Sequence, residues 1–246
     1  MPRALAIETS SRIGSIAVAE GGVVLAEEQF EHGLQHAAQI VPIIDRLCRA
    51  QCWGPREVEH VYVSAGPGSF TGLRIGITLA KTMALATGVK LVAVPSVRVL
   101  VENAPAEARY VIIVLDAKRD QIFTARFERV GDEWIEREPA QLASLSDMLA
   151  RTPRPVHLLG EGIPFHGKFL PKDDLGVIVT DQALWRPKAS VVARLGFATA
   201  ASGQFADPDR LAPIYIRKPE AEEKFEATQA ARSGPKPHPG GDVRAP

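Results

Sequence analysis

Apolar runs separated by short polar or glycine-containing turns divide the first hundred residues into strands and helices. Residues 4–8, 14–19 and 23–30 form three successive runs, which predict a three-stranded meander. Residues 36–50 then place apolar side chains every three or four positions and predict an amphipathic helix. The alternation continues with a strand over 61–64 and, after a glycine-rich loop, a helix over 73–85.

A short strand over residues 91–94 and a helix from Ser96 to Asn103, with Ser96 as its N-cap, complete a βββαβαβα order. A second series then begins with an apolar strand over 110–115 that ends at Asp116. The later predicted elements are an alternating strand over 121–128, a weaker strand near 134–135, a helix after a capping box formed by Ser144 and Asp147, strands over 156–159 and 177–179, and a helix over 188–201.

The two series share a pattern rather than identical residues. LAIETSSRIGSIAVA and IIVLDAKRDQIFTARF each contain an apolar strand, an acidic end, a polar turn and an alternating strand. This repetition predicts an α/β protein made of two duplicated βββαβα units. We expect an N-terminal lobe over residues 1–103 and a C-terminal lobe over residues 104–217. Residues 218–246 are charged and then rich in proline and glycine, which predicts a disordered tail.

Composition narrows the classes of function. Lys plus Arg and Asp plus Glu both total 29, so no overall basic field attracts nucleic acid or an anionic membrane. Cys48 and Cys52 have too few convergent partners for a metal site or a disulfide framework. No apolar run reaches the ~20 residues of a membrane span, and the N-terminus lacks the long apolar region of a signal peptide. We expect a soluble, cytoplasmic protein, and if RNA is involved, we expect another molecule to supply most of the contacts with it.

The glycine-rich loop before the helix over 73–85 is the first candidate site. A strand-to-helix loop presents backbone N–H groups and the positive end of the helix dipole, which suit an anion. The loop matches neither the Walker motif nor GxGxxG, and it would serve equally as a tight turn that lets the helix pack closely. The residues concerned in this loop and the start of the helix are Gly66, Gly68, Ser69, Thr71, Gly72, Arg74 and Gly76.

Small residues recur every four positions along that helix. A stripe of this kind lets a second helix approach closely. The partner helix could belong to the same lobe or to another subunit, and the pattern alone allows both. The stripe consists of Gly72, Gly76, Ala80 and Ala84, flanked by Leu73, Ile77 and Met83.

Glu8 and Asp116 form a candidate pair of acids at the ends of equivalent strands. Two such carboxylates could hold Mg²⁺ or orient a water molecule during phosphoryl transfer, with Thr9 and Ser10 supplying hydroxyls to the same ligand. The segment DAKRDQ after the second strand lacks the glycine that a phosphate-binding turn normally needs. We therefore do not expect intrinsic ATP hydrolysis.

SAGPGSFTGLRIG resembles the characteristic motif of the TsaB family, formerly called YeaZ, of bacterial tRNA threonylcarbamoyladenosine biosynthesis proteins. Other segments agree: LAIETSSRIGSIAV, with Glu8 where Asp is common, HAAQIVPIID, DAKRDQIFTARF and APIYIRK. The resemblance covers most of residues 4–218. It implies a two-lobed, actin-like and Hsp70-like ATPase (ASKHA) fold.

The resemblance also implies a role. Members of the family are non-catalytic relatives of TsaD, the subunit that transfers a threonylcarbamoyl group to adenosine 37 of tRNAs reading ANN codons. They pair with TsaD, and the ATPase TsaE joins the assembly. The resemblance thus implies a subunit that scaffolds or activates TsaD, forms a homodimer when alone, meets tRNA only through the complex and has no cofactor of its own, while the complex uses ATP and Mg²⁺.

Histidines separate this chain from its catalytic relatives. The catalytic subunit carries a metal-binding HxxxH pair shortly after the helix that follows its glycine loop, whereas this chain has VPSVRVLVEN there. His32 and His36 precede the loop, and with Gly33 between them and no acidic third ligand at a matching offset they are expected to be polar residues around a helix start. We therefore expect no metal site.

We expect the partner to dock on the helices over 36–50 and 73–85. The interface residues predicted there are His36, Ile40, Ile44, Gly72, Arg74, Gly76, Ala80, Met83 and Ala84. Two alternatives stay open: a stand-alone ATP-dependent phosphotransferase that uses Glu8 and Asp116, and a nucleotide-binding module without turnover.

Overall fold

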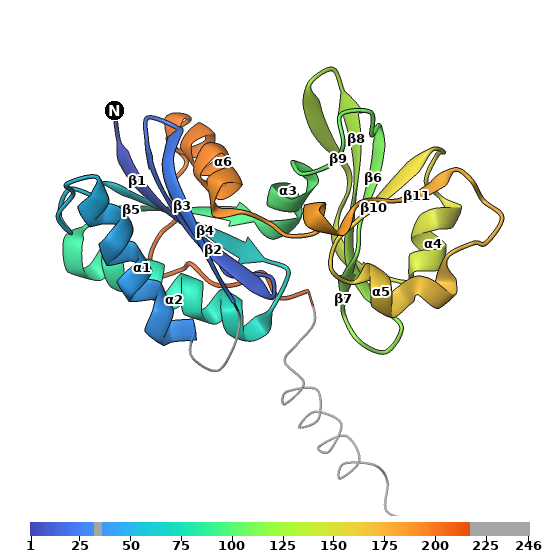
Figure 1. Cartoon of the computed structure of the whole chain (residues 1–246), viewed down its shortest axis with the longest axis horizontal. Helices are drawn as coiled ribbons and strands as arrows, with labels where there is room; N and C mark the ends of the chain where they lie inside the picture. The colour runs from blue at the N-terminus through green and yellow to red at the C-terminus, as the bar shows by residue number, and fades with distance from the viewer. Residues whose placement is uncertain (32–35, 217–246) are drawn as a thin grey trace, which may run out of the picture. The chain divides into compact units, whose positions relative to one another are not determined.

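The first meander forms as predicted and provides three strands of a five-stranded mixed sheet (Figure 1). The computed structural model describes residues 1–31 and 36–216. The strand order of the first sheet is β3-β2-β1-β4-β5. Strand β2 lies antiparallel to both β1 and β3, while β1, β4 and β5 run parallel to one another. Its strands are β1 (Arg3–Glu8), β2 (Ile13–Glu20), β3 (Val23–Glu31), β4 (His60–Gly66) and β5 (Lys90–Pro95). The helices between and after them are α1 (His36–Ala50), α2 (Phe70–Thr87) and α3 (Ser96–Val101).

A second sheet is built by residues 110–179. Its order is β11-β10-β6-β8-β7, and β9 pairs with β8. Its strands are β6 (Tyr110–Ile113), β7 (Leu115–Asp116), β8 (Ile122–Val130), β9 (Glu133–Ala143), β10 (Val156–Leu159) and β11 (Val177–Val179). The remaining elements are the helices α4 (Leu145–Ala150), α5 (Ile163–His166) and α6 (Ala189–Ala201) and the 3₁₀ helices η1 (Gly167–Phe169) and η2 (Gln182–Leu184).

The two sheets share one topology. The path β3-β2-β1-β4-β5 of the first sheet corresponds to β9-β8-β6-β10-β11 of the second, with parallel and antiparallel neighbours in the same places. The sequence places only a weak strand near residues 134–135, yet β9 is eleven residues long. The chain therefore has the duplicated α/β architecture of the actin-like ATPase fold, as the sequence predicts.

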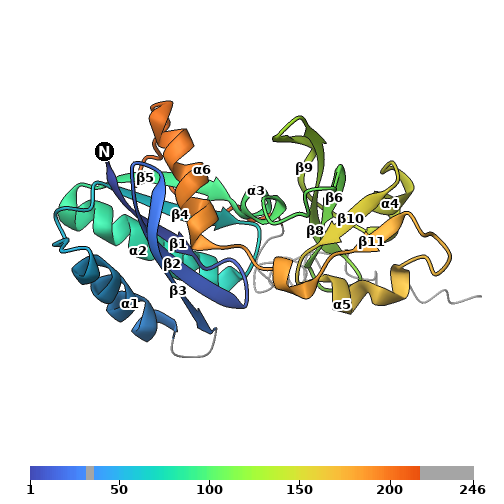
Figure 2. The same cartoon turned by 45° about the horizontal axis from the view of Figure 1, so that its top comes forward.

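The first sheet is covered on both faces because successive residues of its strands are apolar and point to opposite faces. Leu5 and Ile7 point to the side of α1 and α2, while Ala4 and Ala6 belong to the cluster that includes α6. Figure 2 shows α6 on the opposite face of the sheet from α1 and α2. The small residues on this face let α6 lie close to the strands.

Helix α6 follows the second sheet in the sequence but packs against the first. A Cβ at Gly196 would collide with the ring of the buried Tyr62, and the Ser15 hydroxyl accepts a hydrogen bond from Ala189 N–H at 2.8 Å. The sequence predicts this helix but places it in the C-terminal lobe, residues 104–217. Residues 1–216 form one compact unit, so the division at residue 103 stays a prediction, and the expected tail lies outside the described residues.

Two predicted helix starts need correction. Helix α2 begins at Phe70, three residues before the predicted start, because the Ser69 hydroxyl caps it by accepting from Gly72 N–H. Ser96 is not an N-cap, because Pro95 holds that position and the Ser96 hydroxyl lies 2.6 Å from the Ser64 hydroxyl. The predicted cap at Ser144 is confirmed, since its hydroxyl accepts from the N–H of Asp147.

Candidate functional site

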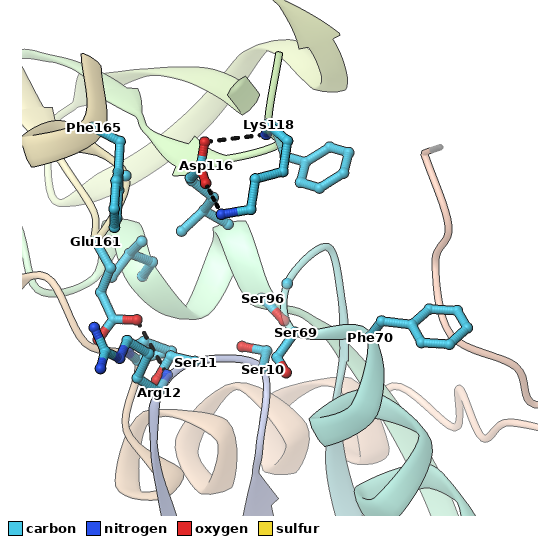
Figure 3. Close-up of a pocket in the computed structure, with 16 residues that line it drawn as sticks. Ser10, Ser11, Arg12, Ser69, Phe70, Ser96, Asp116, Lys118, Glu161 and Phe165 are labelled. Atoms are coloured by element: carbon cyan, nitrogen blue, oxygen red, sulfur yellow. Dashed lines mark hydrogen bonds and ion pairs between the residues drawn. The ribbon is translucent and has the colours of Figure 1, made fainter. Parts of the chain in front are cut away.

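A pocket of about 460 Å³ is lined by residues of both sheets and their loops (Figure 3). The first sheet contributes the turn after β1 and the glycine loop, and the second contributes the turns after β7 and β10. Its charged, hydroxyl-bearing, aromatic and glycine lining residues include Ser10, Ser11, Arg12, Gly68, Ser69, Phe70, Ser96, Asp116, Lys118, Phe123, Glu161, Gly162 and Phe165.

Glu8 ends β1 but does not line this pocket. Its side chain is fully buried, and its Oε1 accepts a hydrogen bond from Ser10 N–H at 2.5 Å, while Oε2 has no hydrogen-bond partner among the described residues. Burial raises the pKa of the Glu8 carboxyl; the hydrogen bonds from Ser10 oppose this, and the charge of Glu161 adds to it. The acid predicted to face a ligand therefore faces its own hairpin and favours the neutral form.

The glycine loop closes onto the same hairpin. Ser69 N–H donates to the Ser10 carbonyl at 2.7 Å, and a Cβ on Gly68 would collide with that carbonyl. Gly66 N–H donates to the Ser96 hydroxyl at 3.0 Å. The N–H groups of Gly66 and Ser69 are thus bonded inside the chain, which favours the tight-turn interpretation of the loop.

The turn after β7 carries a strained backbone and a charged pair. Lys118, Arg119 and Asp120 all have positive φ, at 63°, 55° and 57°, so this turn adopts the left-handed region without glycine. The Asp116 carboxylate forms an ion pair with Lys118, with 2.8 Å between Oδ2 and Nζ. Its Oδ1 accepts a hydrogen bond from Lys118 N–H at 3.1 Å and lies 3.2 Å from His166 Nε2. Partial burial would raise the pKa of Asp116, but these hydrogen bonds outweigh it and lower the pKa. Asp116 is therefore charged at neutral pH.

The turn after β10 brings Glu161 to the first sheet. Arg12 N–H donates to Glu161 Oε2 at 3.1 Å (Figure 3). Arg186 Nε lies 3.7 Å from Oε1 of the same side chain. Glycines at 160 and 162 allow this placement, because a Cβ on either would collide with backbone of residues 114–116. Glu161 is not among the residues predicted from the sequence; the signal that the sequence contains is an acid between two glycines directly after an apolar strand.

The structure places the predicted ligand residues in two groups. Ser10, Gly68, Ser69 and Asp116 line the pocket. Glu8, Thr9 and Gly66 lie outside the lining, with Glu8 and Thr9 fully buried, and Thr71 is exposed on α2. Ligand binding itself stays a prediction. Lining residues that the predicted set lacked include Arg12, Lys118, Glu161 and Phe165.

The predicted interface needs a larger correction. Gly72, Gly76 and Ala80 are buried against the first sheet, so the small-residue stripe serves packing inside the chain rather than contact with a partner. At Gly76 a Cβ would collide with the hydroxyl of Thr9. Ile44, Met83 and Ala84 are half-buried and pack on the same core. His32 lies outside the described residues, and so does the side chain of His36.

The outer sides of α1 and α2 form a shallow apolar groove of about 400 Å³. Of the predicted interface residues, Ile40 and Arg74 line it; Ile40 is largely covered by its neighbours, and Arg74 is exposed. Val41 is 57% exposed, although it sits in the middle of an apolar surface. The lining residues are Ile40, Val41, Arg74, Ile75, Thr78, Leu79 and Thr82.

Residues 1–31 and 36–216 contain no group of three or more His, Cys, Asp or Glu side chains placed to hold a metal ion. No helix in the same ranges is long and apolar enough to cross a membrane.

Three kinds of comparison with known proteins find relatives from the same group of proteins. The family model of tRNA N6-adenosine threonylcarbamoyltransferase, TsaD, matches residues 15–225. The tRNA threonylcarbamoyladenosine biosynthesis protein TsaB of Bacillus subtilis is 31% identical over 230 residues, covering 92% of this chain and 98% of its own length. TsaB of Escherichia coli is 23% identical over 221 residues, covering 87% and 94%. The structure of YeaZ from Pseudomonas aeruginosa shares the fold, with a TM-score of 0.72 at 22% identity over 87% of this chain and 100% of that one.

Proposed function

We propose, from the premise that this chain belongs to the TsaB family of tRNA threonylcarbamoyladenosine biosynthesis proteins, that it acts as a non-catalytic subunit. In this proposal it binds a TsaD-like catalytic subunit in the cytoplasm, and a TsaE-like ATPase joins the assembly. The complex forms N6-threonylcarbamoyladenosine at position 37 of tRNAs reading ANN codons. ATP and Mg²⁺ are used by the complex, and tRNA meets this chain only through its partner.

The observation that carries the docking proposal is the exposed apolar groove on α1 and α2. Val41 is 57% exposed, and Ile75 and Leu79 are half-buried beside it, so the surface exposes apolar area that a partner would remove from water. Thr78 and Thr82, on the exposed side of α2, are uncharged, and Arg74 is the charged residue of the lining. In the absence of the catalytic partner, we propose that the same face pairs two copies of the chain.

The pocket supports a non-catalytic role. Phosphoryl transfer with Glu8 and Asp116 requires two carboxylates facing a common ligand. Glu8 is buried and bonded to its own hairpin, and Asp116 is held by Lys118. Neither observation favours the stand-alone phosphotransferase, so we do not carry that alternative forward.

Co-expression with a TsaD-like subunit tests the docking face. Substituting Thr78→Arg places a cation in the apolar groove without disturbing buried residues, since Thr78 is exposed. We expect the captured partner to fall by about tenfold or more, because burying an unpaired charge is costly. The matched control is Ala198→Arg, an exposed position on α6, which lies on the other face of the sheet and should capture as much partner as the wild type.

Two results would contradict this proposal. One is a wild-type protein that captures no TsaD-like subunit. The other is a Thr78→Arg variant that captures as much TsaD-like subunit as the wild type does, while circular dichroism shows that the variant is folded.

A further inference from the structure

Arg74 places a positive charge at the apolar groove on α1 and α2. It lies one helical turn after Phe70, and its guanidinium stacks on that ring, with 3.8 Å between Cζ and the ring centroid. Arg74 Nε donates a hydrogen bond to the Tyr215 hydroxyl at 2.9 Å. An aromatic face and a hydrogen-bond acceptor therefore hold the guanidinium in one orientation.

The acceptor of this hydrogen bond is itself fixed to the first sheet. Next to Tyr215, Ile214 N–H donates to the carbonyl of Ala65 in β4 at 2.7 Å. The ring of Tyr215 lies 5.2 Å from that of Phe70, measured between centroids. A long side chain that is already held in place loses less conformational entropy when a partner binds. Arg74 is thus prepared for a contact at the groove.

The Nη groups of Arg74 are left for such a contact. Within residues 1–31 and 36–216, Arg74 forms no ion pair, and its side chain donates one hydrogen bond, through Nε. Lys81, the other cation of α2, donates instead to the backbone carbonyls of Asp209 and Leu211. Arg74 therefore presents both its charge and its Nη donors to whatever enters the groove.

The group that fits this guanidinium best is a carboxylate. A carboxylate can accept two parallel hydrogen bonds from one guanidinium. The neighbouring lining residues are apolar or carry hydroxyl groups, so apolar side chains of the partner would surround its carboxylate. An RNA backbone fits less well, because it is bound by several clustered cations and the described lining includes one.

A second copy of the chain does not offer this carboxylate from the same face. The described lining of the groove contains no Asp or Glu, and Asp45 on α1 forms an ion pair with Arg49 at 2.8 Å. Self-pairing through this face would therefore remove Arg74 from water without giving it a counter-ion, which is costly. A different protein with an acidic side chain on its docking surface avoids this cost.

We propose that Arg74 determines which partner the groove accepts. It binds a carboxylate on the apolar docking surface of the catalytic subunit and so favours that subunit over a second copy of the chain. Phe70 and Tyr215 are positioning residues that hold the guanidinium for this contact. The inference rests on the docking proposal above and adds the chemistry of the partner to it.

Binding of a purified TsaD-like subunit to the immobilised full chain tests the inference, with interferometry at about 50 mM and about 500 mM NaCl. Arg74→Met keeps an apolar side chain beside Phe70 but removes the charge. We expect it to weaken binding about tenfold or more and to lose most of the rise in Kd that salt causes in the wild type. Tyr215→Phe keeps the charge, so it should weaken binding less and keep the wild-type response to salt.

The matched control is Arg194→Met, which removes an exposed cation from α6 on the other face of the sheet and should bind as the wild type does. Sedimentation equilibrium of the chain alone then separates the choice of partner from general packing. Arg74→Met should self-associate at least as strongly as the wild type, because it removes an unpaired charge from the paired face.

Separate outcomes identify which proposal fails. If Thr78→Arg blocks binding but Arg74→Met binds as tightly as the wild type, this inference is overturned and the docking proposal stands. A wild type that binds no TsaD-like subunit overturns both. The inference also fails if Arg74→Met weakens self-association as much as partner binding. Loss of binding after both proteins are treated with nuclease would make RNA the source of the anion and overturn it as well.

Discussion

At the scale of the residue, the carboxyl of Glu8 explains why the expected acid pair does not form. Glu8 ends its strand where the sequence places it, but its side chain turns back to Ser10 N–H and is fully buried. An unpaired buried charge is costly, so the neutral acid is favoured, and the unpartnered Oε2 is where the proton can reside. Glu8 is therefore a structural hydrogen-bonding group.

This gives a pH-dependent prediction. The folded pKa of Glu8 is raised, so the folded state binds a proton that the unfolded chain releases near pH 4.5. The free energy of unfolding of the wild type should therefore fall relative to that of a Glu8→Gln variant as the pH rises from about 4.5 toward the folded pKa. The fall should be at most about 1.4 kcal/mol per pH unit. Urea unfolding of both proteins at several pH values measures this. A constant difference between them would contradict the neutral-acid assignment.

At the scale of the element, helix α2 shows how one pattern can have two uses. Gly72, Gly76 and Ala80 let the helix lie directly on the first sheet. The face left to solvent carries Arg74, Thr78 and Thr82, which line the groove that we assign to a partner. The spacing of the small residues predicts a close helix contact, but it cannot tell a strand of the same chain from a helix of another.

Gly76→Ala tests the packing of α2. The new Cβ would collide with the Thr9 hydroxyl, and Thr9 is fully buried, so its side chain has little space in which to move away. We expect the free energy of unfolding to fall by about 1–3 kcal/mol, a cost larger than the helix-propensity gain of alanine. Gly167→Ala, with open space around its Cβ, should leave stability nearly unchanged. Equal stability of the two variants in urea unfolding would be evidence against this packing.

Sequence patterns were most informative about elements and least informative about contacts distant in the chain. The repeat around Glu8 and Asp116 predicts the duplicated sheets, because apolar periodicity reports local structure directly. The return of α6 to the first sheet depends on the fit of Gly196 against Tyr62, which no local pattern contains. Glu161 was missed for the same reason, since its partner Arg12 lies on the other sheet.

At the scale of the whole molecule, the two sheets meet around a pocket whose donors are largely bonded within the chain. Ser69 N–H, Gly162 N–H and Arg12 N–H all have acceptors of their own. An apolar groove lies on the outer side of α1 and α2. This arrangement supports a subunit that acts through its surface rather than through chemistry in its own pocket.

Nucleoside mass spectrometry of tRNA from cells depleted of this protein tests the central claim most directly. We predict that threonylcarbamoyladenosine falls on depletion and that it returns when the wild type or the Ala198→Arg control is supplied, but not when Thr78→Arg is supplied. An unchanged level of threonylcarbamoyladenosine after depletion would contradict the account.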